Sequence, residues 1–343
     1  MAWYAEAKVY FDGSHYIAIP RTTRPTKKRP KLPEETITVA VDEVKDSELS
    51  EPSISPEFEE NISIVEVLEM VEESPKMAEK QPKKTKQITK KELFNELYSK
   101  YIDLKKKDRK KMILKDMRDY FEDYEKCEAF VNINFDRKQR NLICRRVRMI
   151  RKANLVNFNY FCTFTYDDKL HTEETFRKKL KNILSLFASR KGWKYMGVWE
   201  RAPETKRLHF HGLFYIPDGT MPGEIEEHKD YNFKLKRRTT TLQNSYFNRR
   251  FGRSDFEPIR SKYDLLEEMS YIMKYLEKTE EKIVYSKGLY QYFISDIIED
   301  DIVCTIGQED RKLLLFDDFM CLDEGELIGK VSPEVIERMR KCN

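Results

Sequence analysis

Residues 207–217 read RLHFHGLFYIP, and their alternation decides the fold that the sequence predicts. Side chains on a β-strand point alternately to opposite faces, so His209 and His211 share one face and Phe210 lies on the other. Two imidazoles side by side are the geometry that a metal site needs. A half-buried strand can also carry such a pair by chance, so the sequence around it has to distinguish the two.

The flanking sequence predicts a sheet of antiparallel strands. NYFCTFTY (159–166) and KYMGVWE (194–200) have the pattern of further strands, and TEETFRKKLKNILSLFASR (172–190) between them has the pattern of a helix. DFEPI (255–259) predicts a short strand, and IVYSKGLYQYFIS (283–295) predicts a strand or hairpin. We therefore expect an α+β fold in which helices pack on one face of the sheet.

The 343 residues divide into five expected segments. YFDGSHYIAIP predicts a hairpin around an Asp-Gly turn. Helices are expected from Thr89 onward, because Thr89 and Glu92 fit a capping box, whereas FVNINF (130–135) alternates as a strand would. The segments are a short N-terminal hairpin (1–19), a disordered, charge-segregated linker (20–85), a helical basic region expected to bind DNA (86–154), a strand-and-helix domain (155–300) with an insertion at about 217–255, and a C-terminal tail (301–343).

Charge is strongly segregated although the net charge is only +4. From Glu34 to Lys80 the sequence has 15 acidic residues and 3 lysines, a local balance of −12 that leaves +16 for the rest. Few aromatic residues and scattered prolines predict disorder in this acidic stretch, apart from a short amphipathic helix at 62–73. The remainder has the charge of a polyanion binder, and nucleic acid is the first candidate partner. We hypothesise that the acidic stretch competes with DNA for that basic surface.

Basic residues gather in two places. RKQRNLICRRVRMIRK (137–152) has eight basic residues in sixteen, interleaved with apolar ones, which predicts an amphipathic basic helix. Such a helix either contacts phosphates or is merely solvated, and the lack of acidic residues within it favours phosphates. KLKRRTTT and SYFNRRFGR make the insertion basic as well. The candidate DNA-binding residues are Arg137, Lys138, Arg140, Arg145, Arg146, Arg148, Arg151, Lys152, Lys236, Arg237, Arg238, Arg249 and Arg250.

The sequence argues against several classes of protein. No run approaches the roughly 18 apolar residues of a membrane span, and MAWYAEAKVYF lacks the layout of a signal peptide. The six cysteines are widely spaced without a CxxC pair, which argues against a disulfide framework and a thiolate zinc site. The sequence has no GxxxxGK[ST] motif of a helicase. We expect an intracellular, cytoplasmic protein that does not bind membranes.

Glu200, at the end of the strand predicted at 194–200, is a third candidate metal ligand. It precedes His209 by nine residues, and the turn-like RAPETKR between them would let the two strands form a hairpin. One carboxylate and two neutral imidazoles give three ligands and leave coordination positions open for a substrate oxygen or water. Taken singly, a histidine near a sheet is more often structural and a strand-end glutamate is usually solvated. Together, the three residues favour a metal site.

The helix predicted at DLLEEMSYIMKYLEKTEE (264–281) provides a second set of reactive groups. At about 100° per residue, Tyr271 and Tyr275 lie about 40° apart, and Lys274 and Lys278 fall within the same arc of roughly 100°. The apolar side chains occupy the opposite side. The sequence therefore predicts that the helix packs by its apolar face and presents both tyrosines and both lysines on the other. A phenol can attack phosphorus and lysine can stabilise phosphate charge, whereas stacking of the tyrosines on bases is the alternative.

Three motifs in this order resemble those of the HUH endonucleases, and within that family the rolling-circle replication initiators. YFCTFTY resembles the first motif, and HFH within LHFHGLF is similar to the second, a His-hydrophobic-His element. YIMKYLEK resembles the third, Tyr-x-x-Lys, which is duplicated here as in the two-tyrosine initiators of small single-stranded DNA phages and in Helitron-type transposases. Glu200 stands where the family commonly has its third metal ligand. The resemblance covers about residues 155–300.

The resemblance implies a ferredoxin-like, five-stranded antiparallel sheet with helices packed on it and the HxH element on a central strand. It implies Mg²⁺ or Mn²⁺ held by Glu200, His209 and His211, although imidazole ligands also suit zinc. Tyr271 is expected to matter more than Tyr275 as the nucleophile. The implied catalytic residues are Tyr271, Lys274, Tyr275 and Lys278.

The implied reaction is the cleavage of one strand of a single-stranded or hairpin origin DNA. A tyrosine becomes linked to the 5′ phosphate, the free 3′ hydroxyl primes rolling-circle replication, and the reverse step rejoins the strand. Since the chain has no helicase motif, a host helicase and a polymerase are expected partners. A relaxase or transposase with the same chemistry, and a non-catalytic nucleic-acid-binding protein, are the alternatives.

Overall fold

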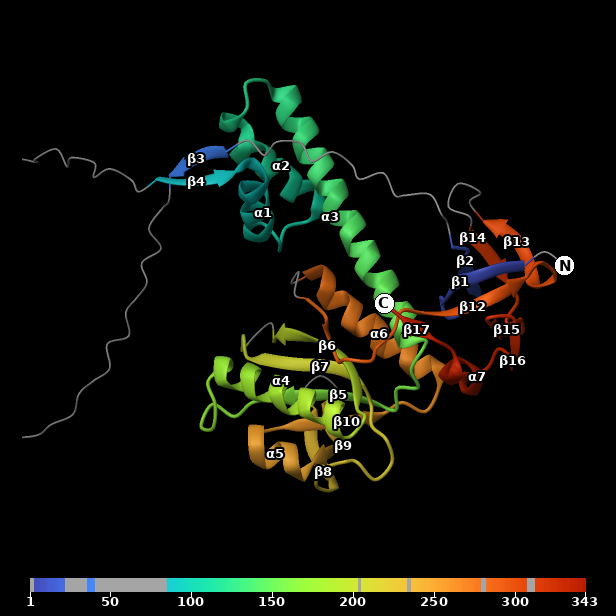
Figure 1. Ribbon diagram of the computed structural model, residues 1–343. Helices are drawn as coiled ribbons and strands as arrows, with labels where there is room; N and C mark the ends of the chain where they lie inside the picture. Colours follow the sequence, from blue (N-terminus) through green and yellow to red (C-terminus); the bar gives the residue numbers. More distant parts are fainter. Residues whose placement is uncertain are drawn as a thin grey trace, which may run out of the picture. The chain divides into compact units, whose positions relative to one another are not determined.

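The computed structural model describes residues 3–21, 36–40, 85–202, 205–232, 236–278, 282–306 and 312–343 (Figure 1). The chain divides into two compact units. The first comprises Met1–Arg29, Ile102–Lys105 and Asn132–Asn343, and the second comprises Pro30–Tyr101 and Lys106–Val131.

A five-stranded antiparallel sheet lies in the first unit, as the sequence predicted. Its order is β10-β5-β7-β6-β11, so β7, which carries the two histidines, is the central strand. Every neighbouring pair is antiparallel. The strands are β5 (Tyr160–Thr165), β6 (Lys194–Arg201), β7 (Leu208–Tyr215), β10 (Ser254–Pro258) and β11 (Val284–Tyr285).

Helices cover both faces of this sheet, so the prediction of helices on one face was wrong. Helices α4 (Glu173–Arg190) and α5 (Ser245–Phe251) pack on the face that holds Phe210. Helix α6 (Lys262–Lys278) packs on the opposite face, which holds Leu213. The reason lies in the strands themselves, because apolar side chains occupy both sides of β7 and each side has to be covered.

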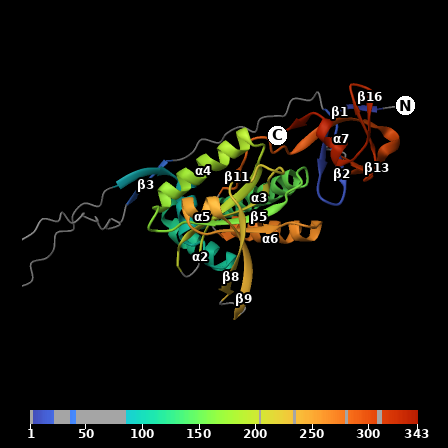
Figure 2. The same ribbon diagram turned by 90° about the horizontal axis from the view of Figure 1, so that it is seen from below.

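The insertion at about 217–255 is a structured part of the same unit. Strands β8 (Ile225–Asn232) and β9 (Arg237–Asn244) pair antiparallel with each other over eight residue pairs and form a two-stranded ribbon. Figure 2 shows the ribbon extending away from the five-stranded sheet. Helix α5 and strand β10 follow directly and return the chain to the core, since Phe247, Phe251 and Phe256 are all buried there.

A second sheet joins the two ends of the chain, a pairing that the sequence did not predict. Its order is β13-β14-β2-β1-β12-β15-β16, with β17 also pairing with β12. The expected N-terminal hairpin is β1–β2, and β1 pairs with β12 of the C-terminal part. The elements are β1 (Trp3–Phe11), β2 (Tyr16–Ile19), β12 (Tyr292–Ile298), the 3-10 helix Glu299–Asp301, β13 (Ile302–Ile306), β14 (Lys312–Leu315), β15 (Met320–Asp323), β16 (Glu326–Lys330), α7 (Pro333–Arg338) and β17 (Lys341–Cys342).

The second unit is a β-hairpin followed by helices. Thr89 caps α1 and forms the predicted capping box with Glu92. Ile113 and Met117 of α2 are buried, as are Phe94 and Leu97 of α1. The elements are β3 (Thr36–Ala40), β4 (Thr85–Thr89), α1 (Lys90–Lys100), α2 (Lys106–Met117), the 3-10 helix Arg118–Tyr120 and the start of α3 (Tyr124–Ala153).

FVNINF, predicted as a strand, lies within helix α3. Val131, Asn134 and Phe135 are buried whereas Ile133 is 67% exposed, so burial follows the i, i+3, i+4 spacing of a helix. Six residues are too few to distinguish the two periods when both apolar and polar positions alternate by chance.

The linker predicted to be disordered at 20–85 is described only in part. Residues 36–40 form β3, which pairs with β4 in register from Thr36↔Thr89 to Ala40↔Thr85. The amphipathic helix expected at 62–73 and most of the acidic stretch lie outside the described residues.

Candidate active site

The two histidines and the glutamate lie on the face of the sheet that α6 covers. The register across β5, β7 and β6 aligns Thr165, His209 and Glu200 in one row. The next row contains Thr163 and His211. Since directly opposite residues point to the same face, the predicted β6–β7 hairpin brings all three candidate ligands to the same side.

Glu200 and His211 converge closely. Oε2 of Glu200 lies 2.9 Å from Nε2 of His211, and the two residues are 6% and 7% exposed. Within the described part of the chain, this buried carboxylate oxygen has no hydrogen-bond partner of acceptable geometry. A buried anionic oxygen without such a partner is costly, so the site as it stands favours the arrival of a cation.

Two threonines of β5 hold the other nitrogen of each imidazole, and the sequence reasoning missed them. Oγ1 of Thr163 lies 2.9 Å from Nδ1 of His211, and Oγ1 of Thr165 lies 2.7 Å from Nδ1 of His209. With Nδ1 engaged, Nε2 is the nitrogen that each ring has left for a ligand. The signal was present as the alternation TFT, which matches that of HFH on the paired strand.

The ring of His209 is held in its neutral form. Burial, followed by the neighbouring His211, lowers the pKa of His209 below its usual range. A neutral imidazole is the form that binds a metal, so both the hydrogen bonds and the burial prepare the ring for that role.

Both tyrosines of α6 contact His211. The ring of Tyr275 stacks on it with centroids 6.2 Å apart and planes at 11°, and the ring of Tyr271 meets it edge-on at 5.4 Å. Tyr271 also contacts Phe161, and the two tyrosine rings lie 4.9 Å apart. The phenols are therefore next to the imidazole and carboxylate of β7 and β6.

This geometry corrects the expected orientation of α6. The tyrosines were predicted to face away from the packing side, but they point to the sheet, while Leu266 is 55% exposed. The sheet below them ends in His211 and Glu200, so phenols with a polar tip pack there in place of aliphatic side chains. Lys274 is exposed, and the side chain of Lys278 lies outside the described residues.

Neither phenol ionises readily in this environment. Burial raises the pKa of Tyr271 far above its ordinary range, with further contributions from its hydrogen bond to Tyr275 and from Glu200. Burial also raises the pKa of Tyr275. A nearby positive charge would oppose both effects, since it stabilises a phenolate.

Acidic residues that the sequence reasoning did not single out lie near the tyrosines. Burial, followed by Glu257, raises the pKa of Glu268 to about 7. Burial also raises the pKa of Glu257 on β10. Glu268 lies one helical turn before Tyr271 and contributes to its raised pKa. These carboxyl groups therefore change charge close to neutral pH.

Two of the three predicted ligands meet, and the third stands apart. Among the described residues, no group of three or more His, Cys, Asp or Glu side chains converges closely enough to hold a metal ion. The rings of His209 and His211 lie 5.9 Å apart. The 2.9 Å between Glu200 and His211 matches the roughly 3 Å edge of an octahedron whose bonds are about 2.1 Å long. The donor set and the unsatisfied oxygen fit a divalent ion.

Two of the predicted DNA-binding residues are structural. Lys152 is 7% exposed, and its Nζ donates to the carbonyl of Leu289 at 2.5 Å and to Asn343. Arg151 pairs with Asp12 at 3.1 Å. The last turn of α3 therefore joins the N- and C-terminal parts of the first unit, which a helix solvated on its basic face would not do.

The remaining candidates are more accessible. Arg140 and Arg148 of α3 are exposed, and so are the basic residues of the ribbon and of α5. Half-buried residues are Arg137, Lys138, Arg145 and Arg146, and the exposed residues of the ribbon and α5 are Lys236, Arg237, Arg238, Arg249 and Arg250.

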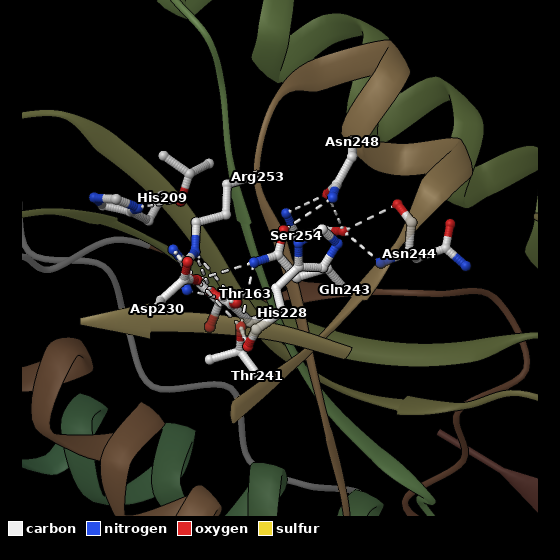
Figure 3. A network of polar contacts seen from close by, with 12 residues as sticks. Thr163, His209, His228, Asp230, Thr241, Gln243, Asn244, Asn248, Arg253 and Ser254 are labelled. Carbon is white, nitrogen blue, oxygen red and sulfur yellow. Dashed lines mark hydrogen bonds and ion pairs between the residues drawn. The ribbon is translucent and has the colours of Figure 1, made fainter. Parts of the chain in front are cut away.

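A polar network fixes the ribbon to the edge of the catalytic sheet (Figure 3). Arg253 pairs with Asp230 of β8 at 2.7 Å and with Asp255 of β10 at 3.0 Å. Gln243 of β9 also donates to Asp230. Because Asp255 lies opposite Thr163 in the register, the network ends beside the row that contains His211.

Comparison with known proteins gives one match. Residues 159–280 match the model of a family described as Replication-associated protein ORF2. The matched segment starts just before β5 and ends just after α6, so it contains the histidines, the glutamate and both tyrosines. No curated protein and no solved structure matches the chain. In the described part of the chain, no helix has the length and apolarity to cross a membrane.

Proposed function

We propose that this chain is a replication initiator that nicks one DNA strand at an origin by tyrosine transesterification. The reaction leaves a 5′-phosphotyrosyl link and a 3′ hydroxyl that primes rolling-circle replication. The observation that carries the proposal is the contact of Tyr271 and Tyr275 with His211 beside the unsatisfied oxygen of Glu200. The match of residues 159–280 to a replication-associated family supports it.

The chemistry requires an attacking phenol, a phosphate and a leaving oxygen in line. The phenolic oxygen forms a bond to phosphorus while the bond from phosphorus to the 3′ oxygen breaks, and the 3′ oxygen takes up a proton. Tyr271 and Tyr275 are in contact, so the second phenol can attack in the reverse or in a successive step. The exposed Lys274 is placed to contact a phosphate from the outer side of α6.

We further propose that Glu200, His209 and His211 hold Mg²⁺ or Mn²⁺. When bound, the ion would polarise the phosphoryl oxygen and lower the pKa of a nearby phenol. His211 and Glu200 are already converged, and Thr165 holds the ring of His209 through Nδ1. Zinc is the alternative that two imidazoles allow.

The proposed DNA partner is a single-stranded or hairpin origin, with a host helicase and polymerase acting before and after nicking in the cytoplasm. The ferredoxin-like arrangement of the HUH nucleases is part of the same proposal. The family match favours a replication initiator over a relaxase or transposase with the same chemistry.

The test is the covalent intermediate. The full chain is incubated with single-stranded origin DNA, with and without Mn²⁺, and a protein–DNA adduct is sought by denaturing electrophoresis. We expect an adduct with Mn²⁺ and none from the double variant Tyr271→Phe, Tyr275→Phe. Tyr263→Phe is the matched control, since this tyrosine of α6 is 84% exposed. Failure to form an adduct, or its persistence in the double variant, would overturn the proposal.

A further inference from the structure

Helix α2 of the second unit has a row of lysines that the proposed nicking reaction does not use. Lys107, Lys111 and Lys115 follow one another at intervals of four residues, and all three are exposed. Residues four apart lie on the same side of a helix, so the three ammonium groups form a stripe about 12 Å long. The sequence of α2, KKDRKKMILKDM, contains two acidic residues, Asp108 and Asp116.

The stripe is not neutralised within the unit. In the part of the chain that the structure describes, no ion pair or hydrogen bond engages these three lysines. Asp116 is occupied elsewhere, since it accepts from the hydroxyl of Tyr101 at 2.6 Å. Like charges four residues apart destabilise a helix, so the stripe is a cost to folding that an anionic partner would relieve.

The core of the unit fixes which side of α2 is available. Ile113 and Met117 are buried, and Arg109 is engaged with the carbonyl of Tyr101 and the ring of Tyr98. The helix is therefore held by its apolar side, and the lysine stripe remains on the solvent side (Figure 1).

The chemistry of this surface favours duplex DNA. A membrane-bound amphipathic helix inserts apolar side chains, but the buried Ile113 and Met117 of α2 are committed to the core. Single-stranded nucleic acid is bound largely through aromatic stacking, and α2 contains no aromatic residue. A line of lysines instead matches the regular phosphates of a duplex, which bind point charges without reading sequence.

We infer that α2 is a second DNA-contacting surface, in which Lys107, Lys111 and Lys115 bind the phosphate backbone of duplex DNA. This surface lies outside the segment that matches the replication-associated family. Its partner is duplex DNA, whereas the proposed nicking site takes a single strand. Duplex binding is measured without cleavage, so the two proposals fail independently.

The experiment measures how salt weakens the binding of the full chain to a labelled duplex of arbitrary sequence. Each phosphate contact adds about 0.9 to the slope of log affinity against log salt, so replacing all three lysines by glutamine should reduce the slope by about 3. The affinity at about 0.1 M salt should fall roughly 100-fold to 1,000-fold. Replacement by arginine, which keeps the charge, should preserve the slope.

A matched variant separates position from net charge. Lys178, Lys179 and Lys181 are exposed on α4, and their replacement by glutamine removes the same charge from another helix. We expect a smaller change of slope from this control and an unchanged circular dichroism spectrum for every variant. An equal change in the α4 control, an unchanged slope in the α2 variant, or loss of binding to anionic vesicles with duplex binding retained would overturn the inference.

Discussion

The two faces of the five-stranded sheet are built from the same strands but are closed in different ways. Against α4 and α5, rings pack on rings, as in the contacts of Phe164 with Phe214, Phe247 and Phe256. Against α6, the apolar packing of Leu213 and Met269 gives way to His211 and the two tyrosines. One face is dry throughout, and the other changes from apolar to polar along the strands.

The difference shows where this fold can carry chemistry. An alternating strand places neighbouring residues in different environments, so Phe210 contributes to the aromatic core while His211, the next residue, reaches the tyrosines. Substitutions at adjacent positions should therefore affect different properties, stability on one face and nicking on the other.

The largest expected effect is on the dry face. Phe210 is 1% exposed, and Phe210→Ala should destabilise the first unit by about 3–5 kcal/mol, because it removes a buried ring and leaves a cavity. Chemical denaturation is the measurement. Leu266→Ala on α6, whose side chain is 55% exposed, should change the free energy of unfolding by less than about 0.5 kcal/mol. Equal effects would mean that the dry face does not determine stability.

The neighbouring residue should affect activity. His211→Ala removes the imidazole between Glu200 and Tyr275, so adduct formation should slow roughly 100-fold to 1,000-fold. His228→Ala, on the ribbon, is the matched control and should leave the rate unchanged. A rate equal to that of the unmodified protein would show that the polar end is not the reaction site.

Thr163 tests whether the hydrogen bond to Nδ1 of His211 matters. Thr163→Val keeps the shape of the side chain and removes the hydroxyl, so the Mn²⁺ concentration needed for half-maximal adduct formation should rise about 10-fold to 100-fold. Thr163→Ser, which retains the hydroxyl, should restore it. If valine and serine behave alike, the hydroxyl has no positioning role.

Glu268 should give the smallest effect, on the pH dependence of stability. Its pKa is raised from 4.5 to about 7 by burial, so the folded state favours the protonated form and loses stability as pH rises between these values. Glu268→Gln removes that loss. Its thermal midpoint should exceed that of the unmodified protein by roughly 2–4 °C at pH 8 and match it at pH 5. Glu267→Gln, exposed on the same helix, should show no such difference.

Local patterns allowed much of the catalytic sheet to be predicted. The alternation of β5, β6 and β7 and the capping box at Thr89 depend on near neighbours in sequence, and the structure has them as expected. Glu200 could be placed beside His209 because a short turn joins their strands. The family resemblance added the tyrosines, which no periodicity identified as catalytic.

Contacts between distant segments could not be predicted. The pairing of β1 with β12 joins residues almost 300 positions apart, and no local pattern records it. The orientation of α6 failed for a related reason, since the wheel ranked side chains by apolarity without knowing that the sheet below ends in His211. Lys152 was counted as a DNA contact because its buried partners, Leu289 and Asn343, are remote in sequence.

The register of β3 with β4 has a practical consequence for engineering. Ala40 and Thr85 are direct partners, so the 44 residues between them leave and re-enter the fold at one point. They include 13 acidic residues and 5 lysines. Since a two-residue turn suffices to join antiparallel strands, this whole stretch can be exchanged for an Asn-Gly linker without cutting a helix or a strand that the structure describes. The chain thus offers a single splice point at which most of its excess negative charge can be removed.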